Sequence, residues 1–250
     1  MKSVLLAVHL VILFSFFFHS SFSAEKENSC AVWSIYVIRS LGSDIGTVWA
    51  KTSGTASDND FRADVDVHVS FLFFRFSLKS TETTSIRGGK VLRYRKTIDN
   101  GGDHKEITGE LERDMFTIVV RDGNKAERKR FPTTIYDVTN MEYPELTLVP
   151  GEVRKMRVLD LENSEVVDRS YRYVAEEQTE IEGRITRVIV ADFADKNCEC
   201  RRWTAVVNGI PVVKRQAGKE KTGIFNPTYS VRQTKVSVPH FNGSKPAGSD

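Results

Sequence analysis

The sequence predicts an all-β protein: one large, strongly curved antiparallel sheet, a half-open barrel with little helix. Three observations carry this prediction. Apolar and polar residues alternate with a period of two along several segments, as in half-buried strands. Turn pairs such as Gly88-Gly89 and Asn208-Gly209 separate the segments. All 7 prolines lie at or after Pro132, so every residue before it can donate its backbone N–H to a sheet.

The clearest alternation runs from Phe61 to Leu78. Apolar residues occupy every second position up to Phe73, and the apolar row continues from Phe74 with its phase shifted by one residue. We interpret this shift as a β-bulge near Leu72–Phe74 within one long strand, because a slip without an extra residue would turn the later side chains to the wrong face. A strand of this length has to bend, which favours a curved sheet.

Shorter segments complete a meander of neighbouring strands and indicate antiparallel pairing throughout. Residues 132–150 predict a short helix or an irregular crossover that prolines bring to an end. The further strands are expected at 80–87, 90–99, 104–111, 115–121, 125–131, 154–161, 166–174, 178–182, 184–193, 201–207, 210–215 and 228–238.

The N-terminus has the pattern of a secretory signal peptide. Lys2 precedes an apolar run from Val4 to Phe18, and Ser21 and Ser23 are small residues at the two positions that a signal peptidase reads. Cleavage is therefore expected after Ser23 or Ala24, which predicts a periplasmic or secreted protein. An uncleaved membrane anchor is the alternative.

The rest of the chain predicts a single β domain over residues 25–238, followed by a disordered tail over 239–250 that is rich in Gly, Ser and Pro. Positive and negative residues nearly balance, with a formal net charge of +3, so the composition does not require nucleic acid or an anionic membrane as a partner. The basic segment Lys125–Arg130 has no interleaved aromatic residues, and we interpret it as a solvated hairpin rather than a nucleic-acid site.

Three cysteines would meet an oxidising compartment after export: Cys30, Cys198 and Cys200. We expect Cys30 to be oxidised in a disulfide with Cys198 or Cys200, which would tie the first strand to a late one. A bond between Cys198 and Cys200 themselves would be strained along one strand. A C-x-C metal site is disfavoured because no second Cys or His pair lies nearby.

Candidate catalytic residues are sparse. Asp64, Asp66 and His68 alternate on the polar side of the longest apolar segment, where a solvated outer face is the expected role. His68, His104 and His240 stand alone, without a G-x-S-x-G or H-E-x-x-H motif. We therefore expect neither catalysis nor a metal or other cofactor. A hydrolase that pairs His104 with a distant Ser remains an alternative.

Two further groups of residues have possible surface or interior roles. The acidic group Glu176, Glu177, Glu180 and Glu182 indicates an exposed strand edge where charge blocks strand addition. Aromatic residues form ordinary core if the sheet packs against a second layer, but they line an apolar ligand cavity if it curls around an unfilled interior. The candidate ligand-lining residues are Phe71, Phe73, Phe74, Phe76 and Trp203, while Trp33 and Trp49 are expected as core or rim anchors.

Several short motifs are spread between Trp33 and Val231: Ile45-Gly46, Glu82, Gly88-Gly89-Lys90-Val91, Thr97-Ile98-Asp99-Asn100-Gly101 and Arg202-Trp203. Together they resemble uncharacterised exported bacterial domain families whose sheets look like those of the periplasmic lipoprotein-carrier (LolA/LolB-like) group. The resemblance implies a curved sheet half-closed around an apolar concave face, and it carries over no catalytic residue. Its implied function is an envelope protein that binds a lipid-like or other apolar ligand. The alternative is a structural or protein-interaction module with a filled core, with another envelope protein as its partner.

Overall fold

The computed structural model describes residues 31–40, 42–55, 57–71, 74–181, 183–221 and 228–237. Its strands form one mixed 15-stranded sheet in the order β8-β7-β6-β5-β4-β3-β2-β1-β15-β14-β13-β12-β11-β10-β9. The sheet is not closed, and its two ends are β8 and β9. The predicted all-β class is therefore confirmed. The predicted signal peptide (1–24), Cys30 and the predicted tail (239–250) lie outside the described residues.

Most strands pair with their neighbours along the chain, as expected of a meander. The first eight are β1 (Ala31–Ser40), β2 (Ser43–Gly54), β3 (Asn59–Phe71), β4 (Phe74–Arg87), β5 (Lys90–Asp99), β6 (His104–Glu112), β7 (Met115–Asp122) and β8 (Lys125–Pro132). The others are β9 (Val138–Thr139), β10 (Val153–Asp160), β11 (Glu165–Ile181), β12 (Arg184–Ala194), β13 (Cys198–Val207), β14 (Ile210–Glu220) and β15 (Thr228–Ser237).

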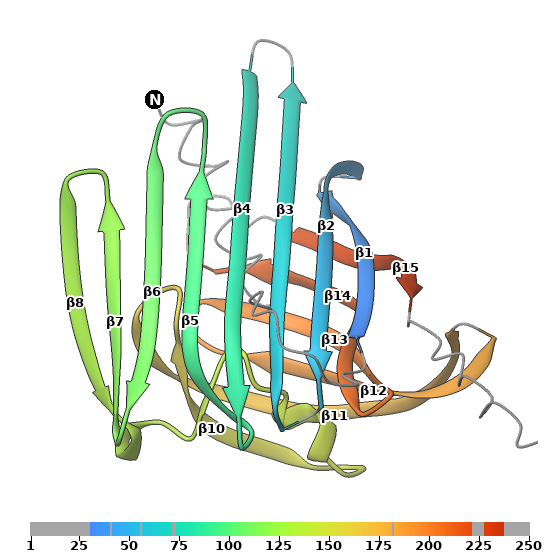
Figure 1. Ribbon diagram of the computed structural model, residues 1–250. Coiled ribbons are helices and arrows are strands. Elements are labelled where there is room, and N and C mark those ends of the chain that lie inside the picture. The colour runs from blue at the N-terminus through green and yellow to red at the C-terminus, as the bar shows by residue number, and fades with distance from the viewer. Residues whose placement is uncertain are drawn as a thin grey trace, which may run out of the picture.

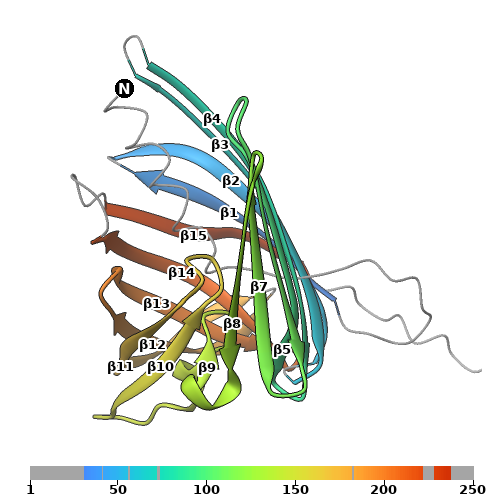
Figure 2. The same ribbon diagram turned by 90° about the vertical axis from the view of Figure 1, so that its left-hand side faces the viewer.

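The sheet bends into two walls. Strands β3 to β8 stand side by side as a front wall, and β10 to β14 cross behind them (Figure 1). The walls lean apart at one end (Figure 2). The strands β1, β2 and β15 join them, since β1 pairs with both of the others. This strong curvature was predicted and is confirmed.

Side chains of the two walls pack against each other between them. One cluster joins Val67 and Leu78 of the front wall to Tyr171, Phe193 and Val213 of the back wall. A second cluster joins β4, β5, β6 and β7 to the crossover and β10, through residues that include Tyr94, Ile107, Phe116, Met141 and Leu159. We call the faces turned toward these clusters inner and the opposite faces outer.

The segment Phe61–Leu78 is a hairpin and not one long strand with a bulge, so that prediction is wrong. β3 ends at Phe71, β4 begins at Phe74, and the two strands pair without interruption from Asn59↔Ile86 to Phe71↔Phe74. A two-residue connection reverses the chain and also shifts the apolar phase by one residue, which is the signature that we attributed to a bulge. The connection, Leu72-Phe73, lies outside the described residues and contains no Gly, Asn, Asp or Pro to signal a turn.

Two smaller predictions also change. β9 pairs with β10 in parallel, so the pairing is not antiparallel throughout. The expected strands 166–174 and 178–182 are one strand, β11, with a register shift between Tyr173 and Ala175. The crossover is irregular, with 3-10 turns η2 (Thr133–Ile135) and η3 (Pro144–Thr147). In the described part of the chain, no helix is long and apolar enough to cross a membrane.

Candidate functional site

Strand β5 shows how the sheet separates two sets of charged residues. Tyr94 and Lys96 point to the inner face and are buried, whereas Arg93 and Arg95 point to the outer face and are exposed. The same alternation in β3 to β8 places further arginines and threonines outside. The outer face of the front wall is therefore polar and rich in cations.

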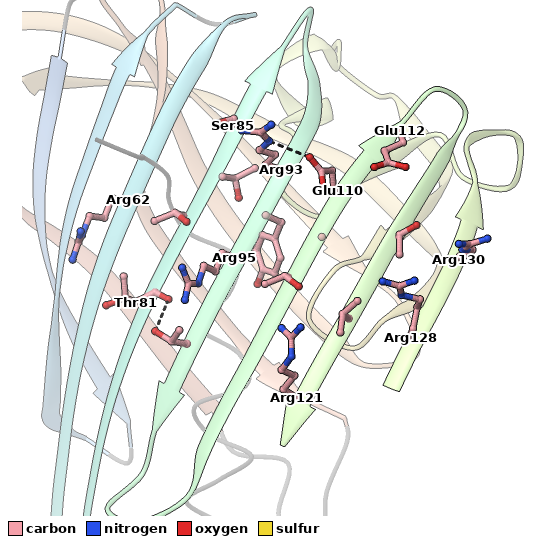
Figure 3. A pocket seen from close by; sticks show the side chains of 18 residues that line it. Arg62, Thr81, Ser85, Arg93, Arg95, Glu110, Glu112, Arg121, Arg128 and Arg130 are labelled. Carbon is pink, nitrogen blue, oxygen red and sulfur yellow. Dashed lines mark hydrogen bonds and ion pairs between the residues drawn. The ribbon is translucent and has the colours of Figure 1, made fainter. Parts of the chain in front are cut away.

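A hollow of about 1060 Å³ lies on this outer face, over β3 to β8 (Figure 3). We call it the arginine groove. Its lining holds two carboxylates, Glu110 and Glu112, beside six threonines and six arginines. The threonines are Thr81, Thr83, Thr84, Thr97, Thr108 and Thr117 with Thr84 turned inward, and the arginines are Arg62, Arg93, Arg95, Arg121, Arg128 and Arg130.

The strand register places one line of groove residues directly across the wall. Cross-strand partners have side chains on the same face, so a chain of partners forms a row perpendicular to the strands. The central row of the groove is Arg62, Thr83, Arg95, Thr108, Val119 and Arg128.

Most of the groove arginines have carboxylate partners on the outer face. Arg95 and Arg121 share Glu106, with N–O distances of 2.8 and 3.1 Å. Arg93 lies 3.3 Å from Glu110. The arginine side chains of these pairs are exposed, although Glu106 is half-buried, so each pair contributes little to stability.

At one end of the groove, Arg62 donates to Asp64 at 2.9 Å. This hydrogen bond raises the pKa of Arg62. Burial opposes ionisation of Asp64, but hydrogen bonds from Arg62 and Thr81 outweigh it and lower the pKa of Asp64. The pair is therefore charged at neutral pH.

At the other end, Arg128 and Arg130 lie on the edge strand β8, where no ion pair to a described residue occupies them. A guanidinium presents a fork of N–H donors that matches the oxygens of carboxylate, sulfate or phosphate groups. The groove thus offers unoccupied anion-binding groups at the edge of the sheet. The exposure predicted for Lys125–Arg130 is confirmed, as most of these residues are exposed, while the prediction that they bind no nucleic acid stays a prediction.

The inner face of the same wall carries a buried ionic cluster. Lys96 donates to Glu162 at 2.9 Å, and both side chains are at most 3% exposed. Tyr94 donates to Glu82 at 2.8 Å. Burial raises the pKa of Glu162 to about 7 although Lys96 opposes the shift, and burial also raises the pKa of Glu82 well above its ordinary value.

A second inner cluster belongs to the back wall. Arg202 donates to Glu145 of η3 at 3.1 Å and to Gln216 at 2.8 Å. Arg169 and Asp195 form another buried pair at 2.7 Å. These groups occupy space between the walls, where an apolar ligand cavity was predicted.

The predicted ligand-lining residues do not form one described site. Phe73 lies outside the described residues, as do the side chains of Phe71 and Phe74. Phe76 is half-buried and packs against the main core cluster. Trp203 packs in a separate small cluster with Val188 and Ala205, and Arg215 lies 4.7 Å over its ring.

The two described cysteines, Cys198 and Cys200, are buried and unbridged. The Cys200 sulfur lies 3.0 Å from the Tyr229 hydroxyl. The predicted bond to Cys30 involves a residue outside the described part and stays a prediction.

The predicted polar outer face of β3 is confirmed: Asp64 and Asp66 are half-buried, and His68 is exposed. His68 lies 2.8 Å from Asp66, and His104 is exposed at the start of β6, while His240 lies outside the described residues. Among the described residues, no three His, Cys, Asp or Glu side chains are arranged to hold a metal ion.

The acidic edge was also predicted correctly. Glu176, Glu177 and Glu180 are exposed on β11, beyond Arg172, where the pairing with β10 ends. Glu176 forms an ion pair with Arg187 at 2.7 Å. Glu182 lies outside the described residues.

Sequence reasoning missed the arginine groove and the inner ionic clusters. For Lys96 a signal was present, because it lies in phase with the buried residues Tyr94 and Ile98. For the groove the signal was weaker, because its row appears only when the register of six strands is known.

The fold and site define an all-β protein with one open, bent sheet, a packed interior and a polar groove on its outer face. The chain belongs to DUF6134, a family described as a domain of unknown function, whose model matches residues 36–204. The match starts within β1 and ends within β13, so β15, the strand that pairs with β1, follows it. No curated protein and no solved structure matches the chain, so the resemblance to lipoprotein carriers stays a prediction.

Proposed function

We propose that this protein is an exported, non-enzymatic binding module that holds an anionic partner in the arginine groove. The single observation that carries the proposal is the pair Arg128 and Arg130, which stand at the edge of the groove without an ion pair to any described residue. Guanidinium groups beside a hollow of about 1060 Å³ are suited to carboxylate, sulfate or phosphate groups.

The packed interior supports this choice over an apolar ligand between the walls. Core side chains of the front and back walls share one cluster. Lys96 with Glu162, and Arg202 with Glu145, add charges to the same space. A lipid placed there would have to separate the two charges of each buried pair, which is costly in a low-dielectric interior.

The proposal is tested with simple polyanions at low salt. The unmodified protein is expected to bind poly-L-glutamate or inorganic polyphosphate, and the variant Arg128→Ala/Arg130→Ala to bind at least about tenfold more weakly, since each lost charged hydrogen bond has about that effect. The control Arg184→Ala/Arg232→Ala removes the same charge from exposed positions on β12 and β15. Equal weakening by both variants, or no binding to any polyanion, would overturn the proposal.

A native mass spectrum of protein purified from its own host addresses the apolar ligand. The proposal predicts the mass of the polypeptide without lipid. A lipid bound in stoichiometric amount would instead favour the apolar cavity inferred from the sequence.

A further inference from the structure

We infer that the arginine groove and the tryptophans beside it form one track for a linear acidic polysaccharide. The inference rests on the proposed function and adds the class of partner. We call this surface the outer track. Its central row runs across eight strands: Trp33, Lys51, Arg62, Thr83, Arg95, Thr108, Val119 and Arg128.

The outer track is continuous and long. Each residue of the row is the direct cross-strand partner of the next, so all eight side chains lie on one face. Strands lie about 4.8 Å apart, so seven steps cover roughly 34 Å. A row of this length suits a chain-like ligand that lies across the strands, and it exceeds what one small anion could contact.

The β1–β2 end of the track supplies flat apolar surfaces. Trp33 and Trp49 are 48% and 47% exposed, which is unusual for such large side chains. The Lys51 ammonium lies 4.8 Å from the centre of the Trp33 ring. Exposed indole rings pack well against the C–H faces of sugar rings, and Trp49 is the direct partner of Asp64 at the edge of the groove.

The spacing of charge favours a polymer with separated carboxylates. Arg62 and Arg95 are two strands apart, and Arg95 and Arg128 are three strands apart, or roughly 10 and 14 Å. Hydroxyl groups of Thr83 and Thr108 stand between them. Sugar hydroxyls can bond to these threonines while the arginines hold the carboxylates.

The carboxylates Glu110 and Glu112 in the groove also favour a polysaccharide over a nucleic acid. They can accept hydrogen bonds from sugar hydroxyls, but they would repel a densely charged polymer such as duplex DNA, which carries a charge about every 1.7 Å of its helix axis when both strands are counted. Bases would also need exposed aromatic side chains to stack on along the groove, whereas the exposed rings of the track, Trp33 and Trp49, lie beside it on β1 and β2. The aromatic residue that lines it, Tyr94, is buried.

The test compares four polymers on the full mature chain: polygalacturonate, neutral dextran, poly-L-glutamate and single-stranded DNA. Polygalacturonate is expected to bind at least about tenfold more tightly than the other three. The variants Arg95→Ala/Arg128→Ala and Trp49→Ala are each expected to weaken polygalacturonate about tenfold. Only the first should weaken poly-L-glutamate, because that polymer has no rings to pack on Trp49.

Each result decides between the two proposals. Groove-dependent binding of poly-L-glutamate or DNA that equals or exceeds polygalacturonate would overturn the polysaccharide inference and leave the anion-binding function standing. Equal binding of dextran would overturn the role of the arginines. No binding of any polymer would overturn both. The control Arg184→Ala/Arg232→Ala should match the unmodified protein with every polymer, and circular dichroism checks that each variant is folded.

Discussion

Arg95 and Lys96 are neighbours in β5, yet their side chains lie in opposite environments and have different roles in the fold. Arg95 is 63% exposed on the outer face, and its partner Glu106 lies on the adjacent strand. Lys96 is 2% exposed on the inner face, and its partner Glu162 lies in the turn after β10, across the interior. One step along a strand therefore changes a solvated charge into a buried one.

The difference extends to the rest of each face. Outer ion pairs in the arginine groove join strands that are already hydrogen-bonded, such as Arg93 with Glu110. Inner pairs join parts of the fold that are far apart in sequence, such as Arg202 and Glu145. The inner pair Lys96–Glu162 thus links the front wall to the turn after β10, while the outer charges are free to exchange their partners for a ligand.

The largest effect is expected from Lys96→Met. The substitution keeps the side-chain volume but leaves Glu162 and Glu82 buried without their cation, which should cost about 3–5 kcal/mol of unfolding free energy at pH 8. Urea unfolding measures this loss. The variant Lys96→Met/Glu162→Met removes both charges and should recover much of it. A loss below about 1 kcal/mol for the single variant would mean that water reaches the cluster.

A smaller effect is expected from pH. The pKa of Glu162 is raised from 4.5 to about 7 in the folded protein, chiefly by burial. Between these values the folded state binds more protons than the unfolded state, so stability falls as the pH rises. Glu162 alone should remove roughly 3 kcal/mol between pH 4.5 and pH 8, and Glu82 acts in the same direction.

The contribution of Glu162 is measured by urea unfolding of the unmodified protein and of the variant Glu162→Gln between pH 4.5 and pH 8. The glutamine cannot titrate, so the decline with pH should become shallower in the variant. Matching slopes for the two proteins would show that Glu162 does not titrate between pH 4.5 and pH 8, and would contradict its burial as a raised-pKa carboxyl.

The sequence was sufficient for features that depend on local chemistry. Gly88-Gly89 and Asn208-Gly209 form the predicted hairpin turns, since both pairs contain residues at positive φ. β5 has the predicted bounds, Lys90–Asp99. The β3–β4 hairpin was missed because Leu72-Phe73 is apolar, and a bulge and a two-residue turn leave the same shift in the alternation.

The site depended on contacts that the sequence does not reveal. Lys96 interrupts an apolar row and could have been identified as a buried cation, but its partner Glu162 lies 66 residues away. The arginine groove needs the register of six strands at once. An error at one hairpin, such as that at β3–β4, moves every later strand relative to its neighbours and hides the row.

The smallest effect on the unfolding free energy is expected from substitutions on the outer face. Arg128→Ala removes an exposed side chain that has no ion pair to a described residue, so the unfolding free energy should change by less than about 0.5 kcal/mol. Arg95→Ala breaks an exposed pair and should cost less than about 1 kcal/mol, since Glu106 keeps Arg121. Urea unfolding of these two variants and of Lys96→Met compares the loss of unfolding free energy on the outer face with the loss on the inner face. Losses from either arginine that approach the Lys96 value would mean that the outer charges hold the sheet together, and that they are not available to a ligand.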